Sequence, residues 1–81
     1  MWSMFLNIAN KYVKQIGLSE IIQLDFIGLL DNAEGMAFNC ITADNSTLSL
    51  SICNKKYATK TCGTEIEYDN VNYIVGEAIP F

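Results

Sequence analysis

The spacing of apolar residues changes at Gly17, and this change limits the chain to a few architectures. Before Gly17, apolar residues recur at intervals of three and four, as on one face of an α-helix. This stripe consists of Phe5, Ile8, Ala9, Tyr12, Val13 and Ile16. After Gly17, apolar residues alternate with polar ones or form short runs between turn residues, as in β-strands. We therefore expect a helix at about residues 3–17 and antiparallel strands at about residues 20–79.

Residues at the two ends of the first segment support its assignment as a helix. Ser3 can cap the first turn, and Gly17 can adopt the left-handed conformation that commonly ends a helix. Lys14 lies in the last turn, where a positive charge interacts favourably with the helix dipole. Trp2, Met4 and Leu6 do not all fit the apolar stripe, and Trp2 and Met4 lie at its start. They indicate either an apolar, frayed start that docks on the sheet or side chains that insert into a neighbouring subunit.

The second half of the chain carries the clearest strand signals. One strand is predicted where apolar residues alternate strictly with small or polar ones, from Leu48 to Cys53. Two further segments, residues 64–68 and 71–75, flank Asp69 and Asn70. These two residue types suit the positive-φ positions of a tight hairpin turn. The sequence therefore predicts a closing β-hairpin.

The middle of the chain is predicted less sharply. Residues 31–35 and 43–46 have the composition of turns, and the segment between them alternates at Met36 and Phe38. Residues 21–30 are rich in apolar side chains without a clean period, and they fit either a strand or a short helix capped at Ser19. The expected fold is mainly β (α+β): one domain, residues 1–81, with an N-terminal helix packed on a small antiparallel β-barrel or sandwich of about five or six strands.

The composition excludes several classes of function. The 81 residues include nine acidic and five basic residues, a net charge of −4, and the bases are all lysines. Without histidine there is no imidazole base and no Cys/His zinc finger. Without arginine there is no bidentate fork for phosphate or guanine, and an acidic chain is a poor DNA-binding protein. Most enzyme classes and sequence-specific DNA binding are therefore not expected.

Cysteine content and apolar runs bear on the compartment. Cys40, Cys53 and Cys62 form no C-x-x-C pair, which argues against a zinc site, and we expect three reduced thiols in a cytosolic protein. No run reaches the roughly 18 apolar residues of a membrane span, and the N-terminus lacks a signal-peptide pattern. The apolar fraction of 51% is high for so short a chain, which suggests surface that a partner covers.

Carboxylates are the remaining candidates for chemistry. Glu65 and Glu67 alternate on one predicted strand, and Asp69 follows at the turn, so they could bind a hard cation or transfer protons. Acidic residues spaced in this way more often form the solvated face of a strand. Tyr57 lies between lysines and could stack on a nucleobase, but no second aromatic residue lies nearby and a soluble loop is the better explanation. We therefore predict no catalytic residue, no metal ligand and no cofactor.

Two motifs in this order resemble the head–tail joining proteins of tailed phages, the head-completion or stopper family. The first is a strand running into Gly-hydrophobic-hydrophobic-Asp-Asn at residues 28–32. The second is a closing hairpin that matches at Gly63, Thr64, Ile66, Tyr68, Tyr73 and Val75. The likeness covers most of the chain. Two features depart from the family pattern: the sequence ends a few residues beyond the hairpin, and residues 54–62 are not clearly helical.

The resemblance implies a virion protein of the phage neck, assembled in the host cytoplasm. It implies a homo-oligomeric ring, of six copies, beneath the portal and adaptor rings, which closes the DNA-filled head and receives tail proteins. DNA would pass through without specific binding, because carboxylates that line a channel repel phosphate. The ring interface is expected at Trp2, Met4, Phe5, Ile79 and Phe81. The channel lining is expected at Asp31, Glu34 and Asp44.

Other interpretations of the sequence remain open. A small acidic inhibitor or immunity protein, such as a phage anti-defence protein or a toxin antidote, would also be short and would act by surface binding alone. It should be soluble by itself, with its acids gathered on one face. Another tail or neck component of the virion is a further alternative, and a small enzyme is the least expected. Oligomeric state separates the first two interpretations.

Overall fold

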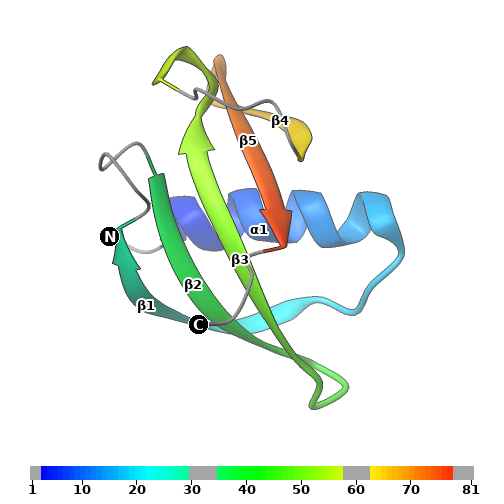
Figure 1. The fold of residues 1–81 in the computed structure, drawn as a ribbon. Coiled ribbons are helices and arrows are strands. Elements are labelled where there is room, and N and C mark those ends of the chain that lie inside the picture. The colour runs from blue at the N-terminus through cyan, green and yellow to red at the C-terminus, as the bar shows by residue number, and fades with distance from the viewer. Residues whose placement is uncertain (1–2, 30–34, 58–62, 78–81) are drawn as a thin grey trace.

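The computed structural model describes residues 3–29, 35–57 and 63–77, which form a helix followed by antiparallel strands (Figure 1). The elements are α1 (Ser3–Ile16), β1 (Ile21–Leu29), β2 (Gly35–Thr42), β3 (Thr47–Asn54), the 3-10 turn η2 (Lys55–Tyr57), β4 (Thr64–Tyr68) and β5 (Val71–Glu77). The expected class, an N-terminal helix packed on an antiparallel sheet, is confirmed, with five strands.

The five strands form one sheet in the order β1-β2-β3-β5-β4, and each neighbouring pair is antiparallel. β3 and β4 therefore run in the same direction, with β5 between them. The chain leaves β3 through η2, which packs on β5, and reaches β4 on the far side. This order places β1 at one edge of the sheet and β4 at the other.

The segment that the sequence left undecided, residues 21–30, is a strand over Ile21–Leu29. Its pairing with β2 shifts register between Ile21 and Gln23 and again between Phe26 and Gly28. Each shift inserts one residue that has no partner on β2, as in a β-bulge. Ile22 and Ile27 are the two inserted residues. The bulges explain why the apolar residues of this strand show no period of two.

The predicted helix end and hairpin turn are both confirmed. Gly17 has a φ of 79°, and the Leu18 amide donates to the Val13 carbonyl at 2.9 Å, which is the geometry of a glycine-terminated helix. Asp69 and Asn70 have φ values of 53° and 66° and connect β4 directly to β5. A two-residue turn with positive φ at both positions matches the twist of the strands it joins.

The core lies between α1 and the inner face of the sheet. Helix α1 contributes Ile8, Ala9, Tyr12 and Val13, and the sheet contributes Ile21, Phe38, Cys40, Leu50, Ile52, Ile66 and Val75. Burying a large aliphatic or aromatic side chain of this kind contributes about 1.5–3 kcal/mol to folding.

The described residues contain no helix with the length and apolar character of a membrane span.

Helix α1 crosses behind the strands and reaches both edges of the sheet (Figure 1). At the β1 edge, the Asn10 side chain accepts a hydrogen bond from the Ile21 amide at 2.7 Å and donates to the Ile21 carbonyl at 3.2 Å. At the β4 edge, the Lys11 ammonium donates to the Glu67 carbonyl at 2.8 Å. Neighbouring residues of one helix thus hold opposite edges of the sheet.

Candidate functional site

Two of the predicted interface residues, Met4 and Phe5, lie beside each other at the start of α1. Both are partly buried and pack against the core, and the Phe5 ring lies 5.4 Å from the Phe38 ring, centroid to centroid. The other three predicted interface residues, Trp2, Ile79 and Phe81, lie outside the described residues.

An apolar hollow of about 180 Å³ opens next to these two side chains. Leu29, Met36 and Tyr73 line it together with Met4 and Phe5, so α1, β1, β2 and β5 all contribute. The hollow lies where β1 ends and β2 begins, and its walls are mainly hydrocarbon and sulfur. A volume of this size accommodates one large side chain from a partner rather than a small-molecule substrate, whose pockets measure about 300–1,000 Å³.

Asp44 is the predicted channel residue that the structure describes, and it lies in the turn between β2 and β3. Its carboxylate accepts hydrogen bonds from the Thr42 hydroxyl and, at 3.1 Å, from the Ser46 amide. These bonds, the Thr42 hydroxyl first, lower the pKa of Asp44 to about 2. The carboxylate is therefore charged at neutral pH and also stabilises the turn. Asp31 and Glu34 lie outside the described residues.

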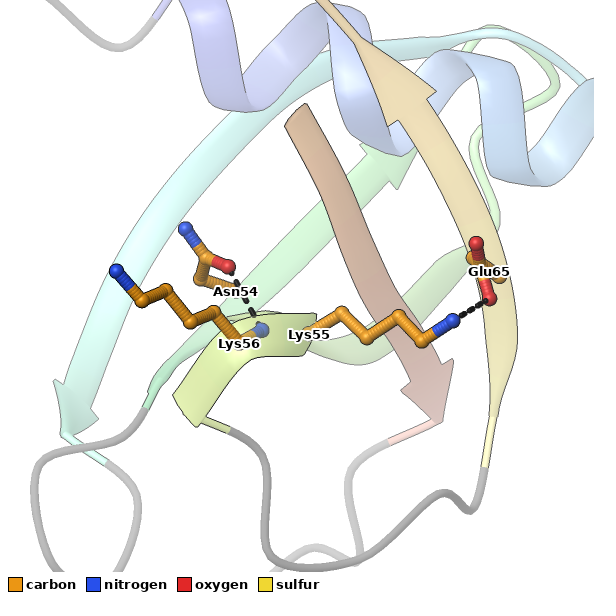
Figure 2. Close-up of polar contacts among 4 residues, drawn as sticks. All are labelled: Asn54, Lys55, Lys56 and Glu65. Atoms are coloured by element: carbon orange, nitrogen blue, oxygen red, sulfur yellow. Dashed lines mark hydrogen bonds and ion pairs between the residues drawn. The ribbon is translucent and has the colours of Figure 1, made fainter. Parts of the chain in front are cut away.

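Glu65 and Glu67 are both exposed and share the outer face of β4, as the alternation predicts. The Glu65 carboxylate forms an ion pair with the Lys55 ammonium at 2.8 Å. Figure 2 shows the Lys55 side chain reaching from η2 across β5 to Glu65. Glu65 thus has a cationic partner and is not arranged as an acid–base pair with Glu67. Among the described residues, no group of three Cys, Asp or Glu side chains could hold a metal ion.

The η2 turn carries Tyr57, the residue considered above as a platform on which a nucleobase could stack. Tyr57 is exposed, and the Lys56 ammonium lies 5.6 Å from the centre of its ring. The Lys56 amide donates to the Asn54 side chain at 2.9 Å, which holds the start of the turn (Figure 2). The Tyr57 ring on which a nucleobase could stack therefore already lies within cation–π distance of the protein's own Lys56 ammonium.

Exposed apolar side chains on β1 form a second surface, which is not among the surfaces predicted from the sequence. The exposed fractions are 61% for Ile22, 46% for Phe26, 45% for Ile27 and 62% for Leu29. Two of these residues, Ile22 and Ile27, are the bulge residues, which have no register partner on β2. The sequence signal for this surface is the apolar run at residues 21–30, in which Gln23 and Asp25 are the only polar residues. Such a run is unusual for an edge strand, which usually carries more charge.

Two buried titratable groups keep their protons. Burial, and secondarily the charge of Asp25, raises the pKa of the Cys40 thiol to about 11. Burial also raises the pKa of the Tyr12 hydroxyl, and the carboxylate of Glu77 adds to this effect. A thiol with so high a pKa is almost entirely protonated at neutral pH and is a weak nucleophile. Cys40 accordingly acts as a small core residue.

Two surfaces therefore stand out in the described part of the chain: the hollow beside Met4 and Phe5, and the exposed side of β1. Both are apolar, and they meet at Leu29. Comparison with protein-family models, with curated proteins and with solved structures finds no match for the chain.

Proposed function

We propose that the protein is a non-enzymatic structural subunit of a phage virion, a head–tail joining protein that acts through contacts between subunits. Copies of the chain form a ring, of six in the family that the sequence resembles, below the portal and adaptor rings. The ring closes the DNA-filled head and provides the surface to which tail proteins attach. DNA passes through it without being held.

The apolar hollow is the observation that carries this proposal. Met4 and Phe5, which the sequence indicates as subunit contacts, line it and are only partly buried beside a packed core. Association between proteins is driven by removing such apolar surface from water, and the buried centre of an interface is its most apolar part. A side chain from the next copy that fills the hollow would extend the core across the subunit boundary.

The charge distribution supports a ring through which DNA moves. The charged residues on the described strands are all acidic, namely Asp25, Glu65, Glu67 and Glu77. Carboxylates that line a channel would repel phosphate and keep DNA from adhering. Asp44 remains charged well below neutral pH, and we propose that it lines the channel with Asp31 and Glu34.

The oligomeric state in solution tests the proposal. We expect light scattering to give a mass well above the 9.0 kDa of one chain. Met4→Gln should reduce this mass toward that of the monomer, because it places an amide in the hollow. Ile16→Gln is the matched control, since Ile16 is exposed at the opposite end of α1 and should leave the mass unchanged. Circular dichroism establishes that both variants fold.

A deletion in the phage that carries the gene tests the place of assembly. We expect DNA-filled heads and separate tails in electron micrographs, and we expect the protein in the mass spectrum of purified wild-type particles. A wild-type protein that is monomeric and absent from particles would contradict the proposal, and the small acidic inhibitor would then be the better interpretation.

A further inference from the structure

Within the described part of the chain, the β1 edge of the sheet is open to another strand. The described residues contain no strand beyond β1 in the sheet. Asn10 engages the Ile21 amide and carbonyl, so the first residue of β1 already has a partner on this side. From there the strand continues to Leu29, a length of nine residues in all. A strand edge of this length is a template for pairing with an extended segment.

The side chains along this edge suit an apolar partner. Leu29 and Ile22 are the two most exposed large apolar residues of the described chain, and Ile27 is also exposed. A strand added beside β1 would cover them. Backbone hydrogen bonds would then supply affinity, and the apolar side chains would select for hydrophobic residues at alternate positions.

The charge at the centre of β1 determines which class of partner fits. Asp25 is the middle residue of β1, is exposed, and accepts a hydrogen bond from the Gln23 side chain at 2.8 Å. Two copies of β1 paired antiparallel about their centres would place Asp25 opposite Asp25 of the second copy. The other edge strand, β4, carries Glu65 and Glu67 and offers no better match. Like charges directly opposite each other destabilise a strand pair.

We propose that the edge of β1 binds an extended segment of a different protein, with apolar residues at alternate positions and a lysine or arginine opposite Asp25. The described strands of a second copy lack such a cation, because their charged residues are all acidic. The inference goes beyond the proposed ring and does not depend on it. Contacts between identical subunits use the hollow, whereas the β1 edge joins the protein to a basic segment of another component.

Two synthetic peptides and the full-length protein test this proposal. Each peptide has nine residues of alternating threonine and valine, with either lysine or glutamate at the centre. Amide chemical shifts of ¹⁵N-labelled protein locate the binding strand and give the dissociation constants. We expect shifts in β1 and an affinity for the lysine peptide about 3- to 10-fold higher than for the glutamate peptide, because one cross-strand pair changes from attractive to repulsive.

Charge reversal on each edge provides the matched controls. Asp25→Lys should reverse the preference between the two peptides, whereas Glu67→Lys should leave it unchanged, because Glu67 lies at the opposite edge of the sheet. Equal affinities for both peptides would overturn the proposal. So would shifts confined to β4, or dilution-dependent shifts at residues 22–27 of the protein alone, because these residues lie away from the hollow and such shifts would identify a second copy as the occupant of the edge.

Discussion

The two edge strands of the sheet differ in length, charge and protection. β4 has five residues, carries Glu65 and Glu67 on its outer face, and is held by the Lys11 ammonium at the Glu67 carbonyl. Its last residue, Tyr68, accepts a hydrogen bond from the Asn7 side chain at 3.2 Å. β1 has nine residues, a single carboxylate at its centre, and exposed apolar side chains. A short, charged edge resists further pairing, and a long apolar edge invites it.

This difference shows that the protein protects its two edges unequally. Its helix holds both edges, and at β1 the hydrogen bonds between α1 and the strand in the described part of the chain are made to its first residue, Ile21. The two bulges of β1 twist the edge locally, which limits uncontrolled pairing while leaving the strand exposed. Selective protection of this kind is expected where one edge binds a partner and the other must not. The following substitutions test the comparison.

The largest effects are expected at the inward-facing residues of the two edge strands. Ile21 and Ile66 are each 1% exposed, and replacement of either by alanine should lower the free energy of unfolding by about 2–5 kcal/mol. Both removals leave a cavity against α1. Chemical denaturation followed by circular dichroism measures the loss. Similar values would show that the two edges are equally anchored to the core and differ only on their outer sides.

Ile22→Ala is the control for this experiment. Ile22 neighbours Ile21 in sequence but is 61% exposed, so its truncation should change the free energy of unfolding by less than about 0.5 kcal/mol. A loss as large as that of Ile21→Ala would contradict the assignment of Ile22 to an exposed bulge, and with it the account of β1 as an open apolar edge.

The second prediction concerns the hydrogen bonds by which α1 holds each edge. Asn10→Ala leaves the partly buried amide and carbonyl of Ile21 without their partner and should cost about 1–3 kcal/mol. Asn7→Ala removes an exposed side-chain bond to Tyr68 and should cost less than about 1 kcal/mol. Urea titrations of the two variants give the comparison. Equal costs would mean that helix propensity, rather than the Ile21 contact, decides the effect.

The sequence predicts the parts of this fold whose signals are local. Gly17 and the Asp69–Asn70 pair specify their backbone conformations by residue type alone, and the strict alternation around Leu50 specifies a strand with one buried face. The bulges of β1 could not be predicted in this way. A bulge is a mismatch between two strands, so it depends on the register of β1 against β2 rather than on the residues of β1 alone.

The candidate surfaces were predictable to a similar extent. The sequence indicates Met4 as a candidate contact residue because Trp2, Met4 and Leu6 do not all fit one helical stripe. The hollow that Met4 lines also needs Met36 and Tyr73, which come from strands far along the chain and meet only in the folded protein. Likewise, Lys55 and Glu65 lie on opposite sides of β5, and no local pattern links them. Surfaces built from distant segments follow from topology, which a single sequence specifies only weakly.

The smallest effect is expected for the ion pair that joins η2 to β4. The Lys55 and Glu65 side chains are 50% and 46% exposed, and exposed pairs contribute about 0–1 kcal/mol. A double-mutant cycle with Lys55→Gln and Glu65→Gln should therefore give a coupling energy within that range. The coupling should become smaller in 1 M salt, because salt weakens the attraction between exposed charges.

Asp25→Asn is the matching variant at the other edge. Asp25 forms no ion pair within the described residues, so its neutralisation should change the free energy of unfolding by less than about 0.5 kcal/mol at any salt concentration. A coupling energy above about 1.5 kcal/mol for Lys55 and Glu65, or one unaffected by salt, would be outside the range of exposed pairs. The ion pair would then hold η2 to β4 across β5. β4 would be protected by this ion pair as well as by its short length and its charge.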